Sequence, residues 1–339
     1  MTAIDLFCGC GGLSEGLRKV GFSVIAAIDS DYLAMEAYRA NHPEVSLFHS
    51  DIRTIRPRSL MKSLNLRRGR LDLLAGCPPC QGFCPLRTLN GSRKTQDPRN
   101  DLIFEFLKFV EQFKPRAVMF ENVPGLSKDK RFQIFCTRMR ELDYIGEYRI
   151  LNAAEYGVPQ RRYRLIYLAG SGRAIPFARP CFTKRTVRDA IGWLPKAGHS
   201  GDPVHDIPEE RSEKTLALVR RIPKNGGSRS DLPAEFILDC HKRCDGFRDV
   251  YGRMTWDDVS PTITGGCFNP SKGRFLHPEE DRAITMREAA LLQSFPKRYK
   301  FPITAGKCAV AEMIGNALPP ELVRRHAQLV KSSLEKRRC

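Results

Sequence analysis

The run GCPPCQGF at residues 76–83 places one cysteine, Cys80, where a rigidly held thiol can act as a nucleophile. It follows the apolar run Leu71–Ala75, and its two prolines stiffen the loop and remove two backbone N–H donors. Because the thiolate is the attacking species, such chemistry needs cations or a helix N-terminus nearby that lower the thiol pKa. Taken alone, a cysteine of this kind is more often a buried structural residue.

A carboxylate and two guanidinium groups occur in two further motifs. Glu121 follows the apolar run Ala117–Phe120 in FENVPG, and Arg162 and Arg164 alternate in QRRYR at residues 160–164. A glutamate whose pKa is raised by burial can hold or donate a proton. Arginines two apart in a strand share a face, where they can contact a substrate oxygen, hold Glu121 or lower a thiol pKa. A solvated acid and a basic surface strand are the alternatives.

Residues 5–12 read DLFCGCGG, a strand that ends in a glycine-rich turn before a helix. Glycines at such a turn let the backbone approach a ligand closely. The spacing departs from the GxGxxG fingerprint, which argues against a nicotinamide dinucleotide. Asp29 ends the second apolar run, where a nucleotide site places the acid that binds ribose hydroxyls, and Asp51 follows the third. Each also fits a helix cap or a loop acid.

Short apolar runs alternate with helical patterns over the first 170 residues, which favours a parallel sheet covered on both faces. The predicted strands are Ala3–Phe7, Val24–Ile28, Val45–Phe48, Leu71–Ala75 and Ala117–Phe120, and the predicted helices are Leu13–Val20, Asp31–Asn41, Asp101–Phe113 and Lys130–Leu142. Tyr144–Leu151 and Arg164–Ala169 are expected to form a hairpin. Since the carboxyl ends of parallel strands border the ligand crevice, this sheet gathers the candidate residues at one edge.

The helical and strand periodicity weakens after about Gly170. Frequent prolines and glycines up to about Arg282 indicate a separate, loop-rich domain. Helical patterns resume at Met286–Leu292 and at Pro319 to about Lys336.

The charge balance indicates a polyanion partner. Lysine and arginine number 56 against 38 acidic residues, for a formal net charge of +18, and nucleic acid is the partner this excess favours. No apolar run approaches the roughly 18 residues of a membrane span, and the N-terminus does not resemble a signal peptide. The 12 cysteines are therefore not expected to form disulfides. Their spacing does not supply two ligand pairs for zinc, so we expect no metal.

Together and in this order, the motifs DLFCGCGG, GCPPCQGF, FENVPG, GVPQRRYR, TMREAALLQSFP and IGNALPP resemble the DNA (cytosine-5) methyltransferase family. The resemblance covers nearly the whole chain except residues 171–282. It implies a Rossmann-like class I methyltransferase fold of the α/β class, with seven mostly parallel strands, helices on both faces and a small loop-rich target recognition domain. It further implies a catalytic domain of residues 1–172 and 305–339, a target recognition domain of 173–281 and a connecting segment of 282–304.

The resemblance also assigns roles. Cys80 matches the nucleophile, Glu121 the group that binds cytosine N3, and Arg162 and Arg164 the catalytic arginines. The residues matching the S-adenosylmethionine site are Phe7, Gly9, Gly11, Gly12, Asp29, Asp51, Ile52, Pro79, Leu102 and Asn316. The residues expected to contact DNA are Gln81, Arg87, Arg99 and Thr262. Asp29 stands where the family usually has a glutamate, and Cys84 where it often has a serine.

The activity implied is methyl transfer from S-adenosylmethionine to C5 of a cytosine flipped out of duplex DNA, with S-adenosylhomocysteine as product. The basic stretch from Phe83 to Asn100 is expected to close over the DNA, unless it is a plain surface loop. We expect a monomer of the bacterial cytoplasm that acts at the nucleoid, as in restriction–modification systems. The alternative is a tRNA cytosine-5 methyltransferase of the same family. That branch has a distinctive CFT segment, and Cys267-Phe268-Asn269 of this chain resembles it only in part.

Overall fold

The computed structural model describes residues 1–79, 98–236 and 249–336. It divides the chain into two compact units. Unit 1 comprises Met1–Tyr156, Tyr163–Pro180 and the C-terminal part from Leu318, and unit 2 comprises Gly157–Arg162 and Cys181–Ala317. The functional domain boundaries expected above stay predictions, because compactness alone does not assign a role to either unit.

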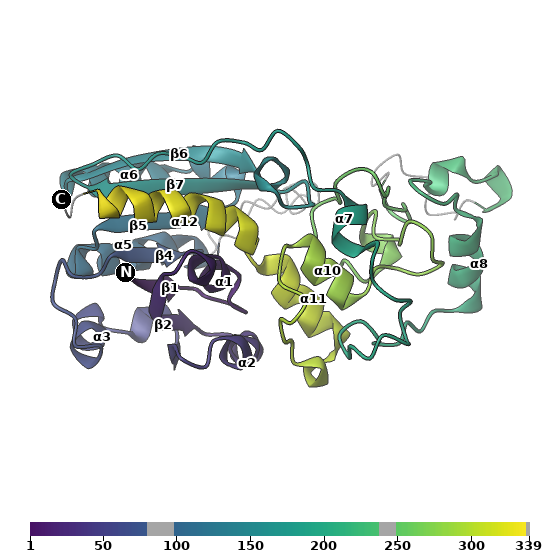
Figure 1. The fold of residues 1–339 in the computed structure, drawn as a ribbon, viewed down its shortest axis with the longest axis horizontal. Helices are drawn as coiled ribbons and strands as arrows, with labels where there is room; N and C mark the ends of the chain where they lie inside the picture. Colours follow the sequence, from purple (N-terminus) through teal and green to yellow (C-terminus); the bar gives the residue numbers. More distant parts are fainter. Residues whose placement is uncertain (80–97, 237–248, 337–339) are drawn as a thin grey trace. The chain divides into compact units, whose positions relative to one another are not determined.

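Unit 1 is built on one seven-stranded sheet with the order β3-β2-β1-β4-β5-β7-β6 (Figure 1). The pairs among the first five strands of that order are parallel, whereas β7 runs antiparallel to both β5 and β6. The expected mostly parallel sheet and the expected hairpin are thus confirmed. The strands are β1 (Thr2–Leu6), β2 (Ser23–Asp29), β3 (Ser46–His49), β4 (Leu73–Gly76), β5 (Ala117–Asn122), β6 (Tyr144–Asn152) and β7 (Tyr163–Ser171).

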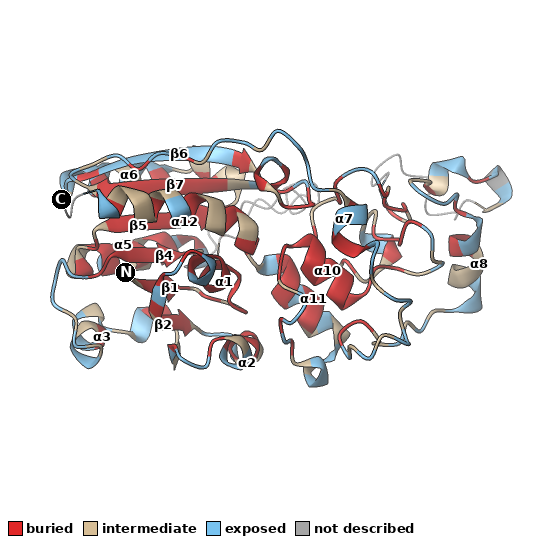
Figure 2. Cartoon of the chain, in the orientation of Figure 1, coloured by how far each residue is buried: buried red, intermediate tan, exposed pale blue. Residues whose placement is uncertain are grey.

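Helices cover both faces of this sheet, as alternating strand residues require. The helices of unit 1 are α1 (Gly12–Lys19), α2 (Tyr32–Asn41), α3 (Pro57–Ser63), α5 (Leu102–Phe113), α6 (Lys130–Glu141) and α12 (Pro320–Glu335). On one face, Ile4 and Leu6 pack in a cluster with Phe106 of α5 and Phe135 of α6. On the other face, Asp5 is hydrogen-bonded to Ser14 of α1, and α12 packs against α1. The central strands β1, β4, β5 and β7 are mostly buried, whereas the two edge strands β3 and β6 consist largely of exposed or half-buried residues (Figure 2).

Unit 2 consists of short helices joined by long loops. In its described part, these helices are α7 (Val187–Ile191), α8 (Glu213–Arg221), α10 (Met286–Leu292) and α11 (Gly306–Asn316) (Figure 1). In the parts of unit 2 that the structure describes, β-pairing is limited to isolated bridges, such as that between Gln160 and Ser260. Polar side chains therefore supply much of the order that strands supply in unit 1.

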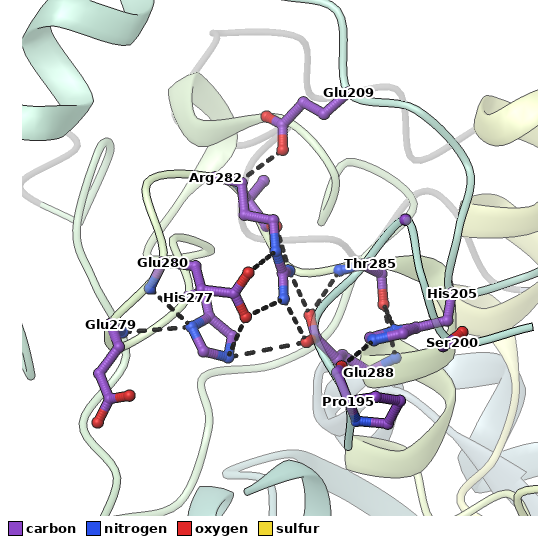
Figure 3. Close-up of polar contacts among 12 residues, drawn as sticks. Pro195, Ser200, His205, Glu209, His277, Glu279, Glu280, Arg282, Thr285 and Glu288 are labelled. Carbon is purple, nitrogen blue, oxygen red and sulfur yellow. Dashed lines mark hydrogen bonds and ion pairs between the residues drawn. The ribbon is translucent and has the colours of Figure 1, made fainter. Parts of the chain in front are cut away.

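One of these polar groups surrounds the start of α10. Figure 3 shows the Arg282 guanidinium between the carboxylates of Glu280 and Glu288, with nitrogen–oxygen distances of 2.8 to 3.1 Å. Thr285 and Glu288 form a reciprocal N-terminal cap of α10. The Thr285 hydroxyl is also 2.7 Å from Nδ1 of His205. The network fixes loop 277–285 onto the buried helix.

No helix among the described residues combines the length and the apolar character that crossing a membrane demands.

Candidate active site

The glycine-rich turn after β1 has an unusual backbone. Phe7, Gly9 and Gly11 have φ angles of 62°, 49° and 95°, a region that side chains other than glycine enter at a cost. Gly11 is also the N-cap of α1, so the turn leads directly into the helix N-terminus. A Cβ added at Gly9 would meet no atom within 4 Å. The backbone conformation, rather than lack of space, therefore requires this glycine, and the turn surface is open to a ligand.

Asp29, at the carboxyl end of β2, holds this turn in place. Its Oδ2 accepts a 2.7 Å hydrogen bond from the Gly9 N–H, and its Oδ1 accepts one of 2.9 Å from the Asp31 N–H. Burial raises the pKa of the carboxyl despite these donors. Asp29, which is shorter than the glutamate usual in the family, thus accepts hydrogen bonds from the protein backbone. A ribose hydroxyl would bind to the lone pairs that remain on its carboxylate oxygens.

The other predicted cofactor residues differ in exposure. Asp51 caps the 3₁₀ turn Ile52–Thr54 and accepts from both the backbone and the side chain of Arg53, which lowers its pKa. Ile52 is buried, and Leu102 packs in the core of unit 1 with 8% exposure. Pro79 is half-buried. Their contacts with a cofactor stay predictions.

Glu121 is the centre of a charged group at the same edge of the sheet. It lies near the end of β5, is 8% exposed, and its Oε1 is 2.9 Å from Nε of Arg164 at the start of β7. Because β7 is antiparallel to β5, its first residues lie beside the carboxyl end of β5. The structure therefore brings together Glu121 and Arg164, two of the four predicted catalytic residues.

Cys77 is a neighbour of Glu121 that the sequence motifs did not single out. It follows β4, whose Gly76 pairs with Phe120, and it lies near enough to Glu121 for that carboxylate to affect its thiol. Burial, together with the negative charge of Glu121, raises the pKa of this thiol far above its usual range. Cys77 is therefore a protonated thiol and a poor nucleophile.

The predicted nucleophile Cys80 lies outside the described residues, as do Gln81 and Arg87, expected to contact DNA. The chain that leads to Cys80 is fixed up to Pro79. Asn122 is 4% exposed and donates from Nδ2 to the Pro78 carbonyl over 2.9 Å. Its Oδ1 accepts from the Val123 N–H. Asn122 was part of a recognised motif, but nothing in its spacing assigned it this role.

A second unanticipated group lies beneath the glycine-rich turn. Asp5 is fully buried, and its Oδ2 accepts a 2.6 Å hydrogen bond from the Ser14 hydroxyl, which is also 2.7 Å from the Tyr38 hydroxyl. The second oxygen, Oδ1, has no hydrogen-bond partner among the residues that the structure describes. Burial raises the pKa of Asp5 from 3.8 to about 7. This acid is thus poised between its charged and neutral forms near neutrality.

Arg162 is in a different environment from Arg164. It belongs to unit 2, is 1% exposed, and donates to backbone carbonyl oxygens. Since β7 begins at Tyr163, the argument that both arginines share a strand face does not extend to Arg162. Its predicted catalytic contact stays a prediction.

The remaining predicted residues lie on or near surfaces. Asn316 is exposed at the end of α11. Arg99 is exposed in the 3₁₀ turn Pro98–Asp101. The Thr262 hydroxyl donates to the Arg161 carbonyl over 2.7 Å, so this side chain supports the backbone beside Arg162.

The chain is similar to known proteins along nearly its whole length. The family model of C-5 cytosine-specific DNA methylases matches residues 1–332. The type II methylase M.HgiDII of Herpetosiphon aurantiacus is 36% identical over 98% of this chain and 96% of its own length. The type II methyltransferase M1.HphI of Haemophilus parahaemolyticus is 33% identical over 97% of this chain and 86% of its own.

Solved structures show the same fold. A protein described as a DNA modification methyltransferase from an E. coli prophage matches with a TM-score of 0.72 and 23% identity over 99% of both chains. The S. pombe Dnmt2 methyltransferase matches with a TM-score of 0.65 and 19% identity over 98% of this chain and 99% of its own. At these identities the likeness establishes the Rossmann-like class I methyltransferase fold alone. From the family model and its relatives, the chain belongs to the C-5 cytosine-specific DNA methylase family and is a DNA (cytosine-5-)-methyltransferase.

Proposed function

We propose that the protein methylates cytosine in double-stranded DNA through a covalent bond between Cys80 and C6 of a base rotated out of the duplex. The observation that supports this best is the Glu121–Arg164 pair at 2.9 Å. It lies beside the loop that leads to Cys80, and Asn122 ties that loop to the same strand end. A carboxyl group and a guanidinium are thus available for the N3 and O2 edge of the base.

Attack by the Cys80 thiolate forms the S–C6 bond and moves the C5–C6 electron pair toward the N3 side of the ring. Glu121 stabilises this charge by donating a proton or hydrogen bond to N3, and Arg164 orients Glu121 and contacts O2. C5 thereby becomes nucleophilic and accepts the methyl group. Loss of the C5 proton to a base then restores the C5–C6 double bond and expels the Cys80 thiolate. Covalent catalysis divides one difficult substitution into easier steps.

The family uses S-adenosylmethionine, which supplies the methyl group as a sulfonium and leaves as S-adenosylhomocysteine. The open space at Gly9, in the turn that leads into the N-terminus of α1, fits a ligand of this kind. In this proposal the cofactor lies against Phe7, Gly9, Gly11, Gly12, Asp29, Asp51, Ile52, Pro79, Leu102 and Asn316. Asp29 fixes the turn through Gly9 and binds ribose hydroxyls with its remaining lone pairs.

Reaching C5 requires the base to leave the stack, at a cost of a few kcal/mol that phosphate and pocket contacts offset. Gln81, Arg87, Arg99 and Thr262 are the proposed DNA contacts, and residues 173–281 the proposed target recognition domain. The formal charge of +18 supports a polyanionic substrate. We assign the protein to the nucleoid of a bacterial cytoplasm, as a monomer that needs no metal.

A trapping experiment tests the nucleophile. In a duplex that carries 5-fluorocytosine at the target, C5 bears fluorine in place of the hydrogen that a base removes. Elimination of Cys80 is then blocked, so the S–C6 bond should persist when S-adenosylmethionine is present. We expect a covalent complex with wild type and with Cys77→Ala, and none with Cys80→Ala. Trapping by Cys80→Ala would refute the assignment. Tritiated methyl transfer to duplex DNA and to tRNA distinguishes the RNA alternative, which predicts incorporation into tRNA alone.

A further inference from the structure

Arg162 is a buried arginine whose guanidinium binds backbone carbonyls. Its Nη1 donates to the Ile263 oxygen over 2.9 Å, and its Nη2 donates to the oxygens of Gly315 and Ala317 over 2.8 and 3.3 Å. With 1% exposure, the charge depends on these oxygens for the solvation that water would otherwise supply. All of these partners belong to unit 2.

Two glutamines hold the same segments. Gln160 is fully buried, donates to Gln293 Oε1 over 2.7 Å and accepts from the Ile263 N–H over 2.9 Å. Gln293 in turn donates to the oxygens of Ile314 and Ala317 over 2.7 and 3.1 Å. Residues 160–162, Ile263 and residues 314–317 are thereby joined in one buried polar network. We refer to Arg162, Gln160 and Gln293 as the carbonyl clamp.

The carbonyl clamp lies where the chain twice leaves unit 2. One exit follows Arg162, and the next residue, Tyr163, begins β7, which brings Arg164 to Glu121. The other exit follows Ala317, and the chain continues into α12, which packs on the helix after the glycine-rich turn. That packing is tight, because a Cβ added at Gly16 would come within 2.5 Å of Val323. The clamp thus holds both exits at one place.

We propose that Arg162 is a positioning residue: it binds the two exit segments together and so sets where β7 begins and how Arg164 presents Glu121. This rests on the proposed function, because it gives Glu121 and Arg164 their roles at the base. It replaces the direct substrate contact that the motif alone suggests for Arg162. Turning its guanidinium to a base would take this donor from the buried carbonyl oxygens of Ile263 and Gly315 and from the part-buried one of Ala317, which is costly.

The test compares three variants. Arg162→Lys keeps the charge but loses the planar fork that reaches three oxygens. Gln293→Met keeps the length of the side chain but removes its donor. Arg253→Lys is the control, since Arg253 is also fully buried in unit 2 and donates to backbone carbonyls away from either exit, those of Val219, Ile222, His277 and Glu280. Arg253 also forms an ion pair with Asp281.

The first readout is the single-turnover methylation rate at saturating DNA and cofactor. We expect Arg162→Lys and Gln293→Met each to lower it by about 10- to 100-fold with little change in the dissociation constant for DNA. Arg253→Lys, within the proposed target recognition domain, should instead act on the dissociation constant for DNA and lower the rate at saturation by less than either clamp variant. The double variant should lose less than the product of the two single effects. A normal rate in Gln293→Met with a slow rate in Arg162→Lys would mean direct substrate contact and overturn the proposal, as would an equal loss in Arg253→Lys.

The second readout needs no catalysis. Amide hydrogen exchange should be faster at residues 163–166, at Leu318 and at residues 321–323 in Arg162→Lys and Gln293→Met, and unchanged there in Arg253→Lys. Unchanged exchange in both clamp variants would contradict the proposal even if methylation were never observed. If Arg162→Lys does not fold, Gln293→Met carries both readouts. Failure of wild type to methylate DNA would instead refute the proposed function, so the two failures are distinct.

Discussion

Nε of Arg164 lies 2.9 Å from Oε1 of Glu121 because an antiparallel strand begins beside the carboxyl end of a parallel one. Both side chains are mostly buried, with 16% and 10% exposure. In this setting the guanidinium compensates a carboxylate that water barely reaches. Removing one partner of such a pair costs more than the pair itself contributes, because it leaves the other charge buried alone.

Arg164→Ala should therefore affect both activity and stability. We expect the single-turnover rate to fall by about 10²- to 10⁴-fold and unfolding free energy to fall by about 3 kcal/mol. Methyl incorporation and urea denaturation measure the two effects. The control is Lys108→Ala, which breaks an exposed pair with Glu105 and should change stability by less than about 1 kcal/mol. Wild-type activity in Arg164→Ala would contradict the role given to the pair.

Asn122→Asp should separate loop positioning from cofactor binding. The aspartate keeps the acceptor for the Val123 N–H but loses the Nδ2 donor to Pro78. The loop before Cys80 then loses an anchor, and we expect a rate at least about 10-fold lower. Equilibrium binding of S-adenosylmethionine, followed by calorimetry, should remain within about threefold of wild type. An equal loss of rate and cofactor affinity would point to general disruption of the sheet edge instead.

Sequence pattern predicted the sheet well, because strand alternation and helical periodicity are local signals. The placement of Asp29 and Glu121 at one edge followed from the parallel order of β2 and β5.

The partners of Arg162 and Cys77 were beyond the reach of such patterns. Arg162 binds carbonyls more than 100 residues away in sequence, and backbone acceptors carry no residue signature. Cys77 meets Glu121 only through the register of β4 against β5, which the sequence of either strand does not specify. Non-local contacts of this kind depend on tertiary packing, so motif spacing alone placed Arg162 with Arg164.

Asp5 should make stability fall as pH rises. Its pKa is about 7 in the folded protein against 3.8 ordinarily, so between these values the folded state binds more protons than the unfolded state. Stability therefore decreases with pH across this window and levels off above about pH 7, by at most about 4 kcal/mol at 1.36 kcal/mol per unit. Urea denaturation from pH 5 to 8 should show this slope in wild type and a flatter one in Asp5→Asn.

Ser14→Ala provides a second check on Asp5. The Ser14 hydroxyl donates to the carboxylate and so favours its charged form. Without that donor the pKa of Asp5 should rise further, and the loss of stability should extend to higher pH. An unchanged pH profile in both variants would show that Asp5 does not control this dependence.

His277 should make unit 2 sensitive to acid, with the opposite sign. Its Nδ1 accepts from the N–H groups of Glu279 and Glu280 at 3.2 and 3.0 Å, so this nitrogen must be unprotonated. Burial lowers the pKa of the imidazole although Glu288 and Glu280 favour its charged form. As pH falls from the unfolded pKa near 6.5 toward the lower folded value, the unfolded state binds the extra proton and stability is lost.

Trp256 reports on this step, because its ring lies 5.2 Å from His277 in an edge-to-face contact and its Nε1 donates to Glu279. We expect tryptophan emission to shift at higher pH than the loss of far-UV circular dichroism from the sheet of unit 1. Trp193→Phe isolates the Trp256 signal, since the chain has 2 tryptophans. His277→Gln, which can accept one N–H but does not titrate, should remove the acid-dependent part of the shift. A shift that persists unchanged in His277→Gln would assign the acid sensitivity to the carboxylates around Arg282, which lose their charge at lower pH.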